Sequence, residues 1–347
     1  MTGFFADRKR RHIAILGALA LASLLAAALA LHHRAEVVAP KYTPHALFPG
    51  LAARLNGITH IRIVSKKGGS FEVAFVPEKG WVLPGRADYP ADFKTVKTTL
   101  TALGALQAVE PKTDRPELFH YVDLDAPPGG NGVAVTVAGD KGRVLAALIV
   151  GKSVPGGDDS VTLFVRKADG KQSWLAKSPA EFPSAQSDWM DKTVMNLDRS
   201  RVAEVAVRPA SGPAYSVSRA KPGDAAFTLA PLPKGRQLAY PGAADTAASG
   251  AADFSFDDIA PAGEVDFSGA ARVVTRTFDG LTVTIDLKKV GGDAWARIFA
   301  TAAPGKPAAA REARDINTRA DGWAFKLPPY KAAMLAAPLE SLLQPKK

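Results

Sequence analysis

The residues of this chain that could do chemistry form two short motifs. Asp123–Asp125 begins like a calcium-binding loop, but Ala126–Pro128 breaks it, and the required glycine and final glutamate are missing. Ser218-Arg219-Ala220-Lys221 has the Ser-x-x-Lys spacing of acyl-transfer enzymes. That chemistry needs the start of a helix, whereas this motif follows a strand pattern and runs into Pro222-Gly223. We assign neither a calcium site nor a serine nucleophile.

Histidines and cysteines give no better sign of a reactive centre. His45, His60 and His120 each lack a second histidine or a carboxylate at the spacing of a helical metal site. The chain has no cysteine, and so no disulfide or thiolate ligand. Nucleotide-binding glycine loops and the Gly-x-Ser-x-Gly elbow are also missing. We therefore expect no catalytic residue, no metal and no cofactor, and a protein that is not an enzyme.

The N-terminus carries the strongest pattern in the chain. Ile13–Leu31 is an unbroken apolar run of 19 residues, about 28 Å long as a helix. The hydrocarbon core of a bilayer is about 30 Å thick, so this run predicts a membrane-spanning helix. The anchoring side chains are Ile13, Leu16, Leu21, Leu24, Leu25, Leu29 and Leu31.

Basic residues before the apolar run predict its orientation. Arg8, Lys9, Arg10 and Arg11 favour the cytoplasmic side, so the rest of the chain would lie across the membrane. Ala28-Leu29-Ala30 resembles a signal-peptide cleavage site, although the apolar run is long for a signal. We expect a single-pass protein of the bacterial inner membrane with a periplasmic body, and a cleaved signal is the alternative.

Composition indicates an ordered body with a mild basic bias. Hydrophobic residues make up 47% of the chain and charged residues 22%, close to globular averages. Residues 1–34 contain five Lys/Arg and one Asp, which is +4 of the net charge of +10, leaving +6 for the body. This surplus is spread along the chain without basic clusters and interleaved aromatics, so we expect no nucleic-acid partner.

The hydrophobic pattern predicts an α+β fold with two related modules, each an antiparallel sheet with one or two helices. Alternating apolar residues predict hairpins, including one at Asp279-Gly280, and a helix is predicted on the face of Phe93, Val96, Leu100 and Leu103. Ser178–Glu181 looks like a helix start, Ala302–Ala310 like a loop, and Tyr330–Leu343 like a closing helix. Six positions that begin the first module recur 144 residues later: Ile58, Ile61, Ile63, Gly68, Phe71 and Val73 against Val202, Val205, Val207, Gly212, Tyr215 and Val217.

These patterns divide the chain into seven parts. They are a basic tail (1–12), a transmembrane helix (13–31), a periplasmic tether (32–57), a first module (58–187), a linker (188–200), a second module (201–343) and a tail (344–347). Trp189 in the linker, between Asp188 and Asp191, is a candidate for the contact between modules. The other four tryptophans lie in apolar strand patterns that suit a core, and a ligand platform is the alternative.

Five short motifs lie in a recognisable order along the body. They are Trp81-x-Leu83-Pro84, Tyr89-Pro90-Ala91-Asp92, Tyr121-x-x-Leu124-Asp125-x-Pro127, Ile149-Val150-Gly151-Lys152 and Asp188-Trp189-Met190-Asp191-Lys192. Together they resemble one bacterial family, the domain of unknown function 4340 family. The resemblance covers most of 58–343 and is weakest over 241–263. Asp123 stands where the family usually has glycine.

That family is similar to auxiliary proteins of uncharacterised ABC transport systems, including gliding-motility systems, and it offers no catalytic residues to carry over. The resemblance implies a non-catalytic accessory protein whose partners are an ABC permease and its ATPase subunits. A stand-alone envelope scaffold or polymer-binding protein is the alternative, and an envelope hydrolase is a third, because residues distant in the chain can meet in a fold. The oligomeric state is not predicted.

Overall fold

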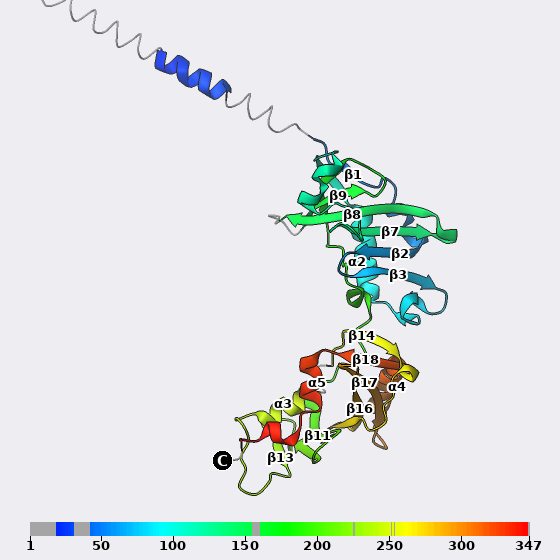
Figure 1. Ribbon diagram of the computed structural model, residues 1–347, viewed down its shortest axis with the longest axis vertical. Helices are drawn as coiled ribbons and strands as arrows, with labels where there is room; N and C mark the ends of the chain where they lie inside the picture. Colours follow the sequence, from blue (N-terminus) through cyan, green and yellow to red (C-terminus); the bar gives the residue numbers. More distant parts are fainter. Residues whose placement is uncertain are drawn as a thin grey trace, which may run out of the picture.

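The computed structural model describes residues 19–30, 42–154, 160–224, 226–250, 252 and 254–345. From residue 42 onward the chain forms two antiparallel sheets with several helices (Figure 1), which confirms the α+β class. The helices of the body are α2 (Phe93–Ala105), α3 (Ala243–Ser249), α4 (Pro307–Ala320) and α5 (Pro329–Leu335).

The first sheet has ten strands in the order β1-β6-β10-β9-β8-β7-β2-β3-β4-β5. Their bounds are β1 (His45–Ala46), β2 (Ile58–Ser65), β3 (Gly69–Val76), β4 (Gly80–Leu83), β5 (Tyr89–Pro90), β6 (Gln107–Pro111), β7 (Val133–Gly139), β8 (Val144–Val154), β9 (Val161–Lys167) and β10 (Ser173–Ser178).

The second sheet has eight strands in the order β13-β12-β11-β15-β16-β17-β18-β14. Their bounds are β11 (Val202–Arg208), β12 (Tyr215–Ser218), β13 (Thr228–Ala230), β14 (Asp258–Pro261), β15 (Ala271–Thr277), β16 (Leu281–Val290), β17 (Asp293–Ala302) and β18 (Trp323–Leu327). The predicted hairpin at Asp279-Gly280 joins β15 to β16, with Gly280 at φ +96°.

The strand order of the second sheet repeats that of the first. Reading β14-β18-β17-β16-β15-β11-β12-β13 beside β6-β10-β9-β8-β7-β2-β3-β4 pairs every strand of the second sheet with a counterpart. The pairing between β2 and β7 shifts register between Ile58 and His60. The pairing between β11 and β15 shifts between Val202 and Glu204, the positions 144 residues later. The two sheets therefore share topology down to the position of a bulge.

Helix α2 forms for the reasons its sequence indicates. The Asp92 side chain accepts hydrogen bonds from the main-chain N–H groups of Lys94 and Thr95, which caps the helix start. Val96, Leu100 and Leu103 are buried, as predicted, and join one hydrophobic core that extends through both modules. Phe93, predicted on the same face, is 63% exposed at the first position of the helix. The helix thus covers the inner face of the first sheet.

One helix prediction and one loop prediction in the body are wrong. Ser178–Glu181 is not helical, because Ser178 ends strand β10 and its hydroxyl donates to the Ala180 carbonyl instead. The loop expected at 302–310 is helical from Pro307, where helix α4 begins. Its buried face is built mostly from alanines (Ala309, Ala313 and Ala320), a weak hydrophobic signal.

Both ends of the body also differ from what the sequence predicted. The closing helix is shorter than Tyr330–Leu343, because α5 ends at Leu335 and Pro338 precedes a separate short turn. At the other end, β1 pairs with β6, and Leu47 and Leu51 are buried in the core. The first sheet thus begins before residue 58.

Helix α4 also supplies hydrogen bonds to the unpaired end of strand β17. Strand β18 pairs with β17 at residues 294–296, so the far end of β17 needs another partner. The Asn317 side chain supplies it: Oδ1 accepts from the Ala300 N–H at 2.7 Å, and Nδ2 donates to the Ala300 carbonyl at 2.8 Å. The Asn317 side chain therefore satisfies the main-chain N–H and carbonyl of Ala300, where a neighbouring strand would otherwise pair.

The predicted anchor lies partly inside the described residues. Residues 19–30 are helical, and Leu21, Leu24, Leu25 and Leu29 are exposed there. Ile13, Leu16, Leu31 and the four basic residues at 8–11 lie outside the described residues. Within the parts of the chain that are described, none of the helices has both the length and the apolar character needed to cross a bilayer. The membrane anchor stays a prediction.

Candidate functional site

The linker between the two sheets is bound along the edge of the first one. Ala91, next to the edge strand β5, pairs with Met190 as an isolated antiparallel bridge. The Asp92 N–H donates to the Trp189 carbonyl at 2.8 Å, and the Asp191 N–H donates to the Pro90 carbonyl at 3.0 Å. This part of the linker therefore behaves as one more edge strand.

The three residues predicted at the module interface all lie in this paired segment. Trp189 is fully buried: its ring lies 6.3 Å from that of Phe71, and its Nε1 donates to the Pro183 carbonyl. Asp188 and Asp191 are held through their carbonyls, which accept from the hydroxyls of Thr95 and Tyr89. These contacts fix the linker to the first module, and the role of the three residues between modules stays a prediction.

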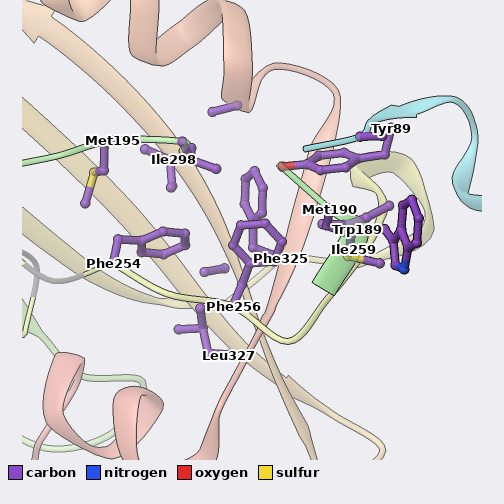
Figure 2. Close-up of a cluster of buried hydrophobic side chains, with 14 of the residues drawn as sticks. Tyr89, Trp189, Met190, Met195, Phe254, Phe256, Ile259, Ile298, Phe325 and Leu327 are labelled. Atoms are coloured by element: carbon purple, nitrogen blue, oxygen red, sulfur yellow. The ribbon is translucent and has the colours of Figure 1, made fainter. Parts of the chain in front are cut away.

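Aromatic contact between the modules is made by Tyr89. Its ring meets Trp323 edge to face, with centroids 5.0 Å apart, and lies 6.1 Å from Phe256. Figure 2 shows Tyr89 pointing from the first module towards Phe256 and Phe325. Burial, and next the charge of Asp191, raise the pKa of Tyr89, so the phenol stays neutral at the junction.

Charged side chains close the junction around these rings. Arg86 forms an ion pair with Asp258 of edge strand β14 at 3.1 Å. Lys192 donates to the Phe256 carbonyl at 2.5 Å, with its ammonium 4.3 Å from that ring centroid. Burial lowers the pKa of Lys192, and neighbouring carboxylates, Asp257 first, oppose part of that effect. Rings, ion pair and linker together hold the two edges as one body.

Sequence reasoning did not identify Tyr89, Arg86 or Lys192 as junction residues. Tyr89 and Lys192 do belong to family motifs, Tyr89-Pro90-Ala91-Asp92 and Asp188–Lys192. A tyrosine directly before Pro-x-Asp at a helix start was a usable signal, because neither capping nor helix propensity needs an aromatic there. Its partners, Phe256 and Trp323, lie more than 160 residues away and could not be paired with it from the sequence.

The second module contains a cavity of about 830 Å³ at one end of its sheet. Ligand pockets typically have volumes of about 300–1,000 Å³ with mostly apolar walls, so this cavity has the dimensions of a binding site. Its apolar wall is formed by Ala271, Leu287, Ala294 and Leu327 of the sheet and by Ala332 and Ala336 at helix α5.

Charged residues line part of this cavity. Lys326 pairs with Asp293 at 2.8 Å, which raises the pKa of the lysine, and Lys288 donates to the Ser268 carbonyl at 2.6 Å. Lys289 lies beside them and is exposed. An apolar cavity with lysines around it suits a molecule that is largely apolar and carries an acidic group.

The motifs that could have carried chemistry lie apart in the fold. His45 packs against Tyr42 and Trp174, His60 lies 3.9 Å from Glu72, and His120 stacks on Tyr121. Within the described ranges, no group of three or more His, Cys, Asp or Glu side chains could hold a metal ion.

Asp123, in the broken calcium motif, has a structural role. It ends the turn Pro116–Val122 in the left-handed conformation, at φ +57°. Glycine adopts this conformation without steric cost, which explains why the family usually has glycine at this position. Aspartate tolerates it, and its carboxylate accepts a hydrogen bond from Asn131 at 3.3 Å. Asp123 therefore ends this turn in a conformation that glycine would also adopt.

Comparison with known protein families identifies the family of this chain. A family model described as domain of unknown function (DUF4340) matches residues 81–271, from β4 through the junction to the start of β15. No curated protein and no solved structure matches the chain significantly. The matched region is more than half of the chain and contains the whole linker, so this protein belongs to the DUF4340 family.

Proposed function

We propose that this chain is a non-catalytic accessory protein of an ABC-type transport system. Residues 13–31 anchor it in the bacterial inner membrane, with the N-terminus in the cytoplasm and the body in the periplasm. Its partners are a permease and the cytoplasmic ATPase of that permease. The apolar N-terminal run and the resemblance to auxiliary transport proteins support this proposal.

The observation that carries the proposal is the packed junction between the modules. The chain enters the first sheet at β1, and the second module begins beyond the opposite edge, at β5. Ten strands spaced about 4.8 Å apart place these edges roughly 40 Å from each other. A spacer of fixed length, closed by Tyr89 and Arg86, suits a part that holds a second surface at a set distance from the membrane.

The second module supplies the surface that would be held there. Its cavity of about 830 Å³ gives the transported cargo, or an outer loop of the permease, a mostly apolar place to bind. Confinement of both proteins to one membrane raises their effective concentration, so even a weak contact would be occupied. We also propose that the two modules, 58–187 and 201–343, arose by internal duplication, which the shared strand order supports.

Photo-crosslinking in intact membranes tests the proposal. Crosslinkers are placed in the full-length chain at exposed Thr43, within the predicted tether, and at Lys289, beside the cavity, with exposed Lys141 as the control position. We expect the crosslinker at Thr43 to capture a permease subunit and the crosslinker at Lys289 to capture cargo or permease. The crosslinker at Lys141 should capture neither. Alkaline phosphatase fused after Lys347 should be active.

A junction variant makes this test specific. Tyr89→Ala loosens the contact between modules, so capture from Lys289 should fall while capture from Thr43 remains. Tyr330→Ala, which removes a ring that is 62% exposed, is the matched control and should change neither. Capture of peptidoglycan alone would favour the scaffold alternative. Turnover of envelope glycan or peptide by the purified chain would favour the hydrolase and overturn the proposal.

A further inference from the structure

A row of charged side chains crosses four neighbouring strands on the outer face of the second sheet. Arg208 of β11 pairs in register with Arg272 of β15, Arg272 with Asp286 of β16, and Asp286 with Arg297 of β17. Because directly opposite residues point to the same face of a sheet, the four side chains form one continuous line.

Asp286 organises two of these arginines. Its side chain is 3% exposed. Arg272 donates Nε to Oδ1 at 2.7 Å and Nη2 to Oδ2 at 3.0 Å, and Arg297 donates Nε and Nη2 to Oδ2 at 3.2 and 3.0 Å. Arg297 also lies over the Phe267 ring, 4.9 Å from its centroid. Both guanidinium groups are thereby held in fixed planes.

The row carries more positive charge than Asp286 can neutralise. Three arginines against one aspartate leave a surplus of two charges. Among the described residues, the Arg208 guanidinium makes no hydrogen bond or ion pair, and Nη1 of Arg272 and of Arg297 donates to no protein atom. Like charges directly opposite on neighbouring strands are destabilising, yet Arg208 faces Arg272 in this way. A bound anion would remove that repulsion.

The row also surrounds a hollow of suitable size. A cavity of about 150 Å³ is lined by the four charged residues together with Phe267, Gly269 and Ala270. An engineered protein cavity of similar volume holds a molecule as large as benzene, so a phosphate group fits here. A second hollow, of about 450 Å³, continues from Arg208 and Arg272 towards Arg276. There is thus room for the remainder of a larger phosphate-bearing ligand.

The geometry points to a binding site for a phosphate-type oxyanion, held by the free N–H groups of Arg208, Arg272 and Arg297. Guanidinium forks match the oxygens of phosphate and bind them bidentately. Asp286 is a positioning residue, because it orients Arg272 and Arg297 and does not touch the anion. This site adjoins the apolar cavity at Gly269, which lines both, and it does not depend on the transport proposal.

A calorimetric titration of the purified full-length chain with inorganic phosphate tests the site. Arg208→Gln should weaken phosphate binding at least about tenfold, since it removes a charge-assisted pair of hydrogen bonds. Arg62→Gln makes the same change at an exposed arginine on the outer face of the first sheet and should leave binding within about twofold. Arg272→Lys keeps the charge but loses the fork, and should also weaken binding.

Lipid vesicles identify the source of the phosphate group. Binding to phosphatidylglycerol vesicles but not to phosphatidylcholine vesicles, lost in Arg208→Gln, would assign the site to a lipid headgroup. Binding of inorganic phosphate without that vesicle dependence would assign it to a soluble phosphate. Absence of saturable phosphate binding by the native chain, or equal weakening by Arg208→Gln and Arg62→Gln, would overturn the proposal.

Discussion

The outer faces of the two sheets have the same row of positions with different chemistry. The equivalent rows are Val64, Ala134, Ile149 and Arg166 in the first sheet, and Arg208, Arg272, Asp286 and Arg297 in the second. One arginine is therefore common to both rows, and the other three positions are apolar in one sheet and charged in the other.

In the first sheet the shared arginine is sealed under a covering segment. Phe119 and Leu124 pack on Ile149, and Arg166 is buried beside them. Its Nε donates to the Leu124 carbonyl at 2.9 Å, and Nη1 donates to the Ala168 carbonyl at 3.0 Å. Burial lowers the pKa of Arg166, and the charge of Asp125 opposes part of that effect.

In the second sheet the cover is shorter and the row stays open. Phe267 takes the place of Phe119, and each ring lies 4.9 Å from the guanidinium carbon of its arginine. Arg297, however, is 37% exposed at its side chain, and Arg272 is 52% exposed. The comparison shows that the arginine–phenylalanine pair belongs to the architecture of the module, whereas the other three charges do not.

Replacing Ile149 of the first row by the aspartate of the second row should have the largest effect on stability. Ile149→Asp puts a carboxylate among Phe119, Leu124 and Phe164, where Arg166 is already bonded to main-chain carbonyls. We expect a loss of about 3–5 kcal/mol in the free energy of unfolding, measured by urea denaturation. Ile149→Val should cost only about 0.5–1.5 kcal/mol. Equal costs for both substitutions would show that the first row is not a sealed apolar surface.

Removing the shared arginine should have the second-largest effect, and it should cost more stability in the first module than in the second. Arg166→Met leaves buried carbonyls without donors and should cost about 2–4 kcal/mol. Arg297→Met should cost about 1 kcal/mol or less, because Arg297 is partly exposed and Arg272 still pairs with Asp286. Denaturation of both variants at one pH measures the difference. A larger loss from Arg297→Met would contradict the contrast between a sealed and an open row.

Protonation of Asp286 at acid pH should have the smallest effect on stability, because it weakens only the ion pairs of the second row. Burial alone would raise the pKa of Asp286, but hydrogen bonds from Arg272 and Arg297 outweigh it and lower that pKa below its ordinary value of 3.8. The stabilisation is therefore present above about pH 4 and is lost as the pH falls through the folded-state pKa.

The substitution Asp286→Asn isolates this effect. It should cost about 1–2 kcal/mol at pH 7, allowing for solvent screening of the arginines, and markedly less near pH 2. Asp140→Asn, on an exposed turn of the first module, should change stability by less than about 0.5 kcal/mol at either pH. A cost of Asp286→Asn that stays constant across this range would show that the carboxylate charge does not stabilise the fold.

Local patterns in the sequence predicted the elements whose causes are local. The α2 face, its Asp92 cap and the Asp279-Gly280 hairpin each depend on residues within a few positions of one another, so they could be read directly. The recurrence of six positions after 144 residues likewise anticipated the paired strands β2 and β3 in one module and β11 and β12 in the other. Helix α4 was missed because its buried face of alanines looks like a loop composition.

The candidate sites depended on distances along the chain that no local pattern encodes. Arg208 and Arg272 lie 64 residues apart, and Tyr89 and Trp323 lie 234 apart, and each pair meets through strand register or module docking. Alternation predicted that Asp286 and its neighbours lie on a strand, but a shift of one residue would have turned them to the opposite face. The sequence by itself thus determined helix α2, the hairpins and the apolar run at 13–31. The tertiary structure decided which charges face one another, because that depends on pairings between distant strands.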